Sequence, residues 1–115
     1  MDNEASYYTY ILRCENGALY CGITTDLSRR INEHTGKAAG GAKYTHANPP
    51  KKCEAVWKSG SRSDASRLEY YIKKLPKAKK EELILSPVNL CSFIPCVNGE
   101  AYEFVKKRKT TKNPF

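Results

Sequence analysis

Two strand-like segments separated by a tight turn open the sequence, and this pair restricts the fold more than any other feature. Residues 7–13 are rich in tyrosine, threonine and branched aliphatic side chains, which favour strands. Residues 18–23 have a similar composition, and Glu15-Asn16-Gly17 between them is typical of a turn. We therefore expect an antiparallel β-hairpin at the start of the domain.

The rest of the chain predicts a mixed fold. After the hairpin we expect a helix capped by Thr24 or Thr25, a strand over residues 53–58 and two further helices separated by Pro76. The element order β-β-α-β-α-α indicates a small α/β (α+β) domain. Its sheet is expected to be three-stranded, mostly antiparallel and flanked by helices.

The chain divides into two parts at about residue 85. Residues 1–85 are expected to form the domain, and residues 86–115 a C-terminal extension that ends in a basic tail. Within the extension, Asn98-Gly99 resembles a hairpin turn, and residues 101–105 have the composition of a short strand.

Charge narrows the class of partner. Twenty Lys and Arg residues against twelve Asp and Glu give the 115-residue chain a formal net charge of +8. This excess indicates a polyanion, above all a nucleic acid and less readily an anionic membrane surface. No apolar run is long enough to span a membrane, and the acidic N-terminus does not resemble a secretory signal. Five cysteines without a paired framework favour the reducing cytoplasm.

Several short motifs, in order, resemble those of the GIY-YIG nuclease superfamily, especially its small stand-alone bacterial members. The resemblance covers roughly residues 7–85, with Cys21 where Ile or Val is usual and Tyr8 where the family name has Gly. The matching positions are Tyr8-Thr9-Tyr10, Tyr20-Cys21-Gly22, Arg30 eight residues later, His34, residues 41–45 and Glu69.

The resemblance implies hydrolysis of phosphodiester bonds with one divalent metal ion. Such hydrolysis needs a base for water and a cation for the developing charge on the phosphate. By analogy with the family, Tyr10 is the general base and Arg30 the cation on the phosphate oxygen. Glu69 would hold one Mg²⁺ or Mn²⁺.

Other positions have supporting roles in this interpretation. Tyr20 and His34 would orient the water or move the proton, and Gly22 would let the backbone approach closely. Basic residues near the long loop and the helix junction would hold backbone phosphates of DNA. The residues chosen for this role are Lys43, Lys73, Lys74 and Lys77.

The length of the first turn tests this site. A two-residue turn sends Tyr10 and Tyr20 to opposite faces of the sheet. A three-residue loop with Gly17 left-handed pairs residue 12 with residue 20 and residue 10 with residue 22, which brings both tyrosines and Gly22 to one face. Because catalysis needs these groups together, we predict the three-residue loop.

Each of these residues also has a purely structural interpretation. Strand tyrosines are often half-buried packing residues, and helical Arg and Glu residues are usually solvated. Two alternatives to a DNA endonuclease therefore stay open: a nucleic-acid-binding module of the same fold without activity, and an RNA endonuclease. We expect the enzyme to be structure-selective or weakly specific and to act in DNA repair or recombination, because no separate specificity domain is evident.

Overall fold

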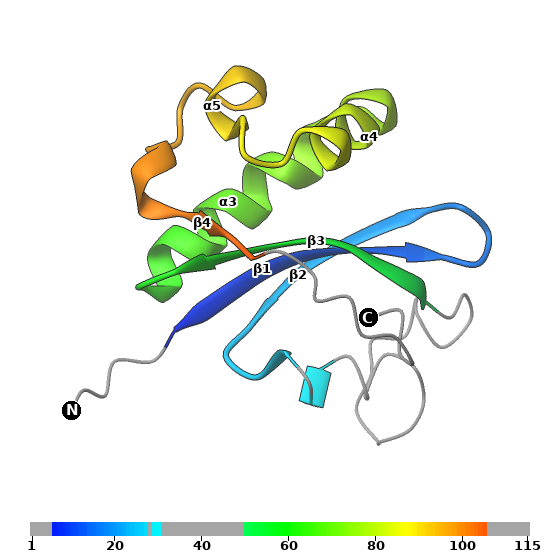
Figure 1. Cartoon of the computed structure of the whole chain (residues 1–115), viewed down its shortest axis with the longest axis horizontal. Coiled ribbons are helices and arrows are strands. Elements are labelled where there is room, and N and C mark those ends of the chain that lie inside the picture. The colour runs from blue at the N-terminus through cyan, green and yellow to red at the C-terminus, as the bar shows by residue number, and fades with distance from the viewer. Residues whose placement is uncertain (1–5, 28, 31–49, 106–115) are drawn as a thin grey trace.

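One antiparallel sheet organises the molecule. A computed structural model describes residues 6–27, 29, 30 and 50–105. Within these residues four strands pair in the order β2-β1-β3-β4. They are β1 (Tyr7–Cys14), β2 (Leu19–Thr24), β3 (Pro50–Ser59) and β4 (Glu103–Phe104). The predicted fold class is confirmed, but the predicted number of three strands is wrong, because β4 adds an edge strand (Figure 1).

The fourth strand comes from the extension. Phe104 lies opposite Trp57 and Glu103 opposite Lys58, so β4 closes the side of β3 that is remote from β1. Two residues pair, and a strand this short gives little periodicity to the sequence. The expected turn at Asn98-Gly99 is instead the start of a 3₁₀ helix (Gly99–Ala101), in which the side chain of Asn98 accepts a hydrogen bond from the amide of Glu100.

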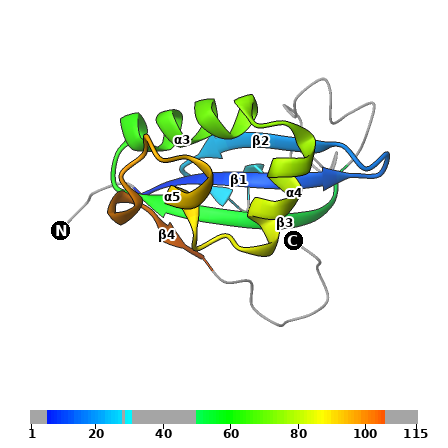
Figure 2. The ribbon, with the colours of Figure 1, turned by 90° about the horizontal axis from the view of Figure 1, so that it is seen from above.

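Helices cover one face of the sheet. They are α3 (Arg62–Lys74), α4 (Lys77–Leu85) and α5 (Leu90–Phe93). All three lie above the strands in Figure 1 and on the viewer's side of the sheet in Figure 2. Ser61 caps α3 by accepting a hydrogen bond from the amide of Asp64, as its position in the sequence suggests. The described helices are too short or too polar to cross a membrane.

The core between the sheet and the helices is the larger of two apolar clusters. Trp57 is its largest buried side chain, and α3 contributes Leu68 and Ile72 at helical spacing. Its buried members are Ile11, Cys21, Ala55, Trp57, Leu68, Ile72, Leu83, Leu90, Ile94 and Val97.

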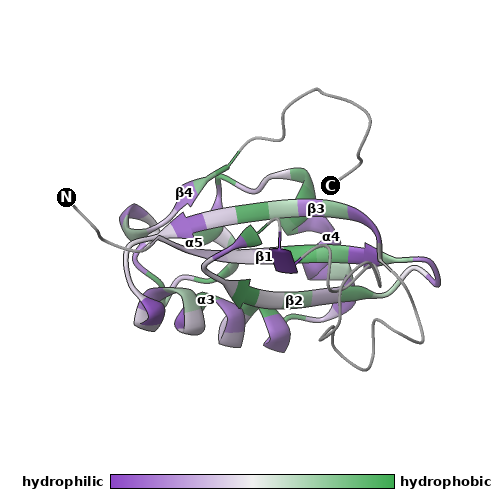
Figure 3. Ribbon diagram, turned by 90° about the horizontal axis from the view of Figure 1, so that it is seen from below, coloured by the Kyte–Doolittle hydropathy of each residue, from purple (hydrophilic) through white to green (hydrophobic). Residues whose placement is uncertain are grey.

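A second cluster occupies the opposite face of the sheet. Tyr10, Leu12, Cys53 and Val56 are buried there. Figure 3 shows this face, where the helical turn that begins at Leu27 lies in front of the strands. Asp26 caps that turn, since its carboxylate accepts a hydrogen bond from the amide of Arg29 at 3.1 Å. The helix therefore begins later than the predicted cap at Thr24 or Thr25.

Candidate active site

The hairpin has the predicted three-residue loop. Tyr10 lies opposite Gly22, and Leu12 lies opposite Tyr20. Gly17 has a φ of 88°, in the left-handed region that glycine adopts without strain, and its amide donates to the carbonyl of Cys14. Tyr10 and Tyr20 therefore belong to the same cluster on the face opposite the helices.

The phenol of Tyr10 lies directly over Gly22. A Cβ atom at Gly22 would stand 2.6 Å from Oη of Tyr10 and 2.8 Å from its Cζ. Real Cβ atoms do not approach other atoms so closely, so glycine is required for this placement of the ring. Gly22 therefore lets its backbone lie close to another group, as predicted, and that group is the Tyr10 ring.

Arg30 reaches the same hydroxyl from the helical turn after β2. Its Nε donates to Oη of Tyr10 at 3.4 Å, and Arg30 itself is half-buried. Tyr10 is almost fully buried, with 1% of its surface exposed. Burial raises the pKa of Tyr10 to about 12, and the hydrogen bond and charge of Arg30 act in the opposite direction. Arg30 is therefore the group that makes ionisation of this phenol easier.

Cys21 is a core residue on the other face. It packs in the larger cluster beneath α3, and burial raises the pKa of its thiol to about 12. It behaves as a small apolar side chain in the position where the family usually has Ile or Val.

Glu69 lies on α3, on the helix side of the sheet, next to the exposed edge of β2. Its side chain is 24% exposed and forms an ion pair with Lys73, with 3.2 Å between Oε2 of Glu69 and Nζ of Lys73. Burial lowers the pKa of Lys73, but the hydrogen bond and charge of Glu69 outweigh it, so that the pKa is raised. Glu69 and Lys73 are one turn apart on α3, which packs against β2, the edge strand that carries Tyr20.

The arrangement offers few ligands for a metal. Among the described residues, no group of three or more His, Cys, Asp or Glu side chains lies close enough together to hold an ion. Glu69 is the one predicted ligand. A hard cation that keeps several water ligands can be held by a single carboxylate. Glu69 is therefore compatible with binding of Mg²⁺ or Mn²⁺, but not with a site in which the protein supplies every ligand.

Comparison with known proteins decides the family. A model of the GIY-YIG catalytic domain matches residues 6–82. The chain belongs to the GIY-YIG family. The match begins just before β1 and ends within α4, so it contains every element that carries Tyr10, Tyr20, Arg30 and Glu69.

Relatives extend the similarity. The UPF0213 protein BH0048 of Halalkalibacterium halodurans is 39% identical over 107 residues, which are 92% of this chain and 99% of that protein. The UPF0213 protein FN1575 of Fusobacterium nucleatum is 46% identical over 82 residues, or 71% of this chain and 80% of the relative. A solution NMR structure of UPF0213 protein BH0048 covers 69% of this chain and 82% of its own, at 45% identity and a TM-score of 0.46.

Membership of the GIY-YIG family implies a nuclease of that superfamily, which acts on nucleic acids. In this GIY-YIG domain, Tyr10, Tyr20, Gly22 and Arg30 lie on one face of the sheet, and Glu69 lies on α3, which packs on the other face. The predicted residues His34 and Lys43 lie outside the described residues.

The chosen lysines differ in their surroundings. Lys73 pairs with Glu69, and the ammonium group of Lys74 lies 4.9 Å from the ring centre of Tyr70. Lys77 donates to the carbonyl of Gly17 at 2.8 Å and pairs with Glu81 at 3.7 Å. All three are exposed, but Lys77 is also part of the contact between α4 and the hairpin.

A basic hollow lies beside Arg30. We call it the arginine hollow, and its volume is about 280 Å³. The sequence did not single it out, because its residues come from three separate segments and share no motif. Its lining residues are Tyr7, Ile23, Thr24, Thr25, Arg29, Arg30 and Arg62.

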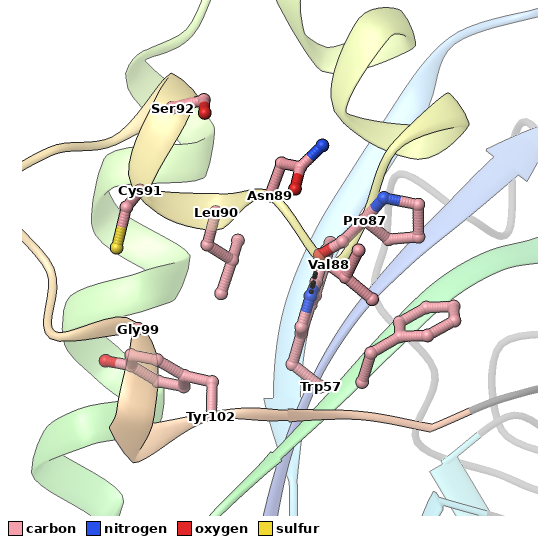
Figure 4. Close-up of a pocket in the computed structure, with 10 residues that line it drawn as sticks. Trp57, Pro87, Val88, Asn89, Leu90, Cys91, Ser92, Gly99 and Tyr102 are labelled. Atoms are coloured by element: carbon pink, nitrogen blue, oxygen red, sulfur yellow. Dashed lines mark hydrogen bonds between the residues drawn. The ribbon is translucent and has the colours of Figure 1, made fainter.

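Another cavity, of about 310 Å³, lies between α5 and the end of the sheet (Figure 4). Its lining is largely apolar, and the indole of Trp57 donates to the carbonyl of Pro87 at 2.9 Å in its wall. None of the predicted site residues lines this cavity.

Proposed function

We propose that this GIY-YIG domain is an endonuclease that hydrolyses phosphodiester bonds in DNA with one divalent metal ion. The observation that carries the proposal is the contact of Arg30 with Tyr10 over Gly22. A structural tyrosine does not need a guanidinium at its hydroxyl and a glycine beneath its ring. A base that must lose a proton benefits from both, because one eases ionisation and the other gives the ring its place.

In this mechanism the chain's own residues bind the phosphate and move the proton. Arg30 donates to a non-bridging oxygen of the scissile phosphate, where negative charge grows in the transition state. Tyr10 acts in its ionised form, which the hydrogen bond and charge of Arg30 favour, and takes the proton of the attacking water. The water oxygen bonds to phosphorus as the P–O bond to the leaving oxygen breaks, and solvent water protonates that oxygen. Tyr20, on the same face, and His34 orient the attacking water or pass the proton on.

Glu69 is the residue proposed to hold Mg²⁺ or Mn²⁺, which would supply further stabilisation of charge at the phosphate. The carboxylate pairs with Lys73 and is partly exposed to solvent, so an ion can reach it. A metal ion would compete with Lys73 for it, so the two cations are expected to exclude each other.

The proposed substrate is DNA, with structure-selective or weakly specific cutting in repair or recombination in the cytoplasm. Support comes from the net charge of +8. Phosphate contacts of this kind position a nucleic acid without reading its bases.

The test is a cleavage assay on plasmid, single-stranded, branched and RNA substrates, with and without Mg²⁺. We expect cutting of DNA that needs the metal. Glu69→Ala and Arg30→Ala should each lower the single-turnover rate at least about 100-fold, since each removes charge stabilisation at the phosphate. Glu82→Ala is the matched control, because Glu82 is an exposed helical carboxylate with a lysine partner.

Each outcome has a distinct meaning. Undiminished cutting by Glu69→Ala would remove the metal-site assignment. Binding without cutting on every substrate would favour the inactive nucleic-acid-binding module, and cutting of RNA alone would favour the RNA endonuclease.

A further inference from the structure

We propose that the arginine hollow is a second phosphate subsite, which holds a backbone phosphate next to the one that is cut. The inference rests on the proposed nuclease function and adds to it two residues, Arg29 and Arg62, that the motifs do not include. The ligand is the backbone of a nucleic acid, whose successive phosphate groups would be bound by the arginine side chains.

The hollow lies immediately beside the candidate centre. Arg30 lines the hollow and also donates to the hydroxyl of Tyr10, so one guanidinium is common to both. Phosphates on one strand of a duplex recur about every 3.4 Å along the helix axis. A backbone that places one phosphate at Arg30 and Tyr10 therefore brings a neighbouring phosphate to the hollow.

The lining suits a phosphate. Arg29, Arg30 and Arg62 each provide a planar fork of donors that matches phosphate oxygens, and the exposed hydroxyl of Thr25 is a further donor. Asp26 offsets part of this charge, since it lies 3.9 Å from Arg29 in an ion pair between two largely exposed side chains. Within the part of the chain that the structure describes, no acidic side chain pairs with Arg62.

Three separate segments build the hollow, and local caps fix two of them. Tyr7 begins β1, Thr24 ends β2 and is followed by Thr25, and Arg62 is the first residue of α3. The hydroxyl of Thr24 accepts from the amide of Asp26 at 3.1 Å, and that of Ser61 accepts from the amide of Asp64 at 3.1 Å. The backbone on both sides is therefore held before a ligand arrives.

The test measures binding without cutting. Fluorescently labelled DNA duplexes are titrated with the full chain in EDTA, so that affinity is read independently of activity. Arg62→Ala should weaken binding about tenfold at moderate salt, as expected for loss of one charge-assisted contact. It should also reduce the magnitude of the slope of log K (the association constant) against log salt concentration by about one, because each phosphate contact contributes about one to this slope.

Arg67→Ala is the control. Arg67 is exposed on the same helix, and its charge acts on Tyr71 and Tyr102, away from the hollow. Its replacement removes the same charge from the molecule, so it should change affinity about twofold or less and leave the slope nearly unchanged. Thermal unfolding of both variants shows whether the fold is intact, and Arg62→Lys, which keeps the charge, should recover most of the slope.

A second measurement locates the phosphate. A series of duplexes, each with one uncharged methylphosphonate linkage, is compared between the wild-type chain and Arg62→Ala. At one linkage beside the cleavage position, neutralisation should weaken binding of the wild type but not of the variant.

Equal losses in Arg62→Ala and Arg67→Ala, or no linkage that depends on Arg62, would overturn the subsite while leaving the nuclease proposal intact. Binding that depends on Arg62 without any cleavage would keep the subsite and refute the nuclease. A wild-type chain that binds none of the duplexes would refute the subsite as well.

Discussion

The most informative single residue is Tyr10, because its position combines deep burial with a polar function. The ring packs among Leu12, Cys53 and Val56, while its hydroxyl meets Arg30. Such a phenol is expected to stay neutral in the folded chain until the pH is far above the ordinary value for tyrosine. Folding and protonation of Tyr10 are therefore linked.

Stability at high pH should depend on Tyr10. Its pKa is about 12 when folded, against 10.0 ordinarily, so the folded state binds this proton more tightly. The resulting stabilisation is fully present below pH 10 and is lost as the pH rises from 10 to 12, by about 3 kcal/mol in total. Urea unfolding across this pH range measures the loss, and absorbance at 295 nm follows tyrosinate formation.

Tyr10→Phe supplies the comparison, since it keeps the ring and removes the proton. Burial also raises the pKa of Tyr102, but Tyr102 is present in both proteins, so its contribution cancels in the comparison. Identical pH dependence in the wild type and Tyr10→Phe would show that Tyr10 ionises as an ordinary tyrosine.

Among individual residues, the sequence correctly predicted which positions of β1 and β2 pair in the hairpin. The turn residues Glu15-Asn16-Gly17 left two loop lengths open, and the need to bring Tyr10 and Tyr20 to one face selected the register that pairs Tyr10 with Gly22. The spacing of Glu69 and Lys73 on one helix is consistent with their ion pair. The placement of Arg62 beside Arg30 depends instead on how α3 docks against the sheet. No local pattern contains that information.

At the scale of elements, the hairpin is tied to α4 by an ionic cluster. Arg13 on β1 donates to Glu54 at 2.6 Å and to both carboxylate oxygens of Glu81, at 2.5 and 2.9 Å. Glu54 occupies a bulge in β3, since Ile11 pairs with Ala55 and Leu12 with Cys53. The bulge turns Glu54 to the helix side, where Arg13 and α4 meet it.

The Arg13–Glu81 contact is expected to stabilise the fold. The hydrogen bond from Arg13 lowers the pKa of Glu81, so this stabilisation is present at neutral pH and is lost as the pH falls through the lowered pKa. Glu81→Gln should lower the free energy of unfolding by about 1 kcal/mol at pH 7, because the pair is only partly shielded from water. Urea denaturation measures it.

Glu82→Gln is the matched control on the same helix, where the carboxylate is 53% exposed and pairs with Lys79 at 3.4 Å. It should change stability by less than about 0.5 kcal/mol. Equal effects of the two substitutions would mean that the cluster at Arg13 is no stronger than an ordinary surface pair.

The elements themselves were predictable to different degrees. Periodic apolar residues predicted α3, and Pro76 marked the junction with α4. The short strand expected over residues 101–105 is present as β4, but its pairing with β3 was not predicted. The bulge at Glu54 was not predicted either, since both features are decided by pairing with a distant strand. Residues 90–93 form a helix too short to show a period.

At the scale of the whole molecule, the C-terminal extension is part of the hydrophobic core, whereas the sequence predicted a separate segment after the domain. Leu90, Ile94 and Val97 are buried in the main core together with Trp57. The hydroxyl of Tyr102 donates to the carbonyl of Asp64 at 2.6 Å, which joins the extension to α3. We propose that residues 86–105 complete the domain and that a separable basic segment begins only after Val105.

Two truncated chains test this division. Removing residues 106–115 takes away five positive charges (Lys106, Lys107, Arg108, Lys109 and Lys112) and no described core contact. This chain should keep its unfolding midpoint and its single-turnover cleavage rate at saturating DNA, while its affinity falls and its salt dependence becomes shallower.

Ending the chain at residue 85 should have a different effect. It removes three buried aliphatic side chains worth about 1.5–3 kcal/mol each and uncovers Trp57, which together approach the 5–15 kcal/mol that stabilises a typical domain. We expect this shorter chain to lose cooperative thermal unfolding, followed by circular dichroism, and with it all cleavage. A chain ending at residue 85 that unfolds at the wild-type midpoint and still cuts DNA would show that residues 1–85 fold alone, and that the packing of the extension against Trp57 adds nothing the nuclease needs.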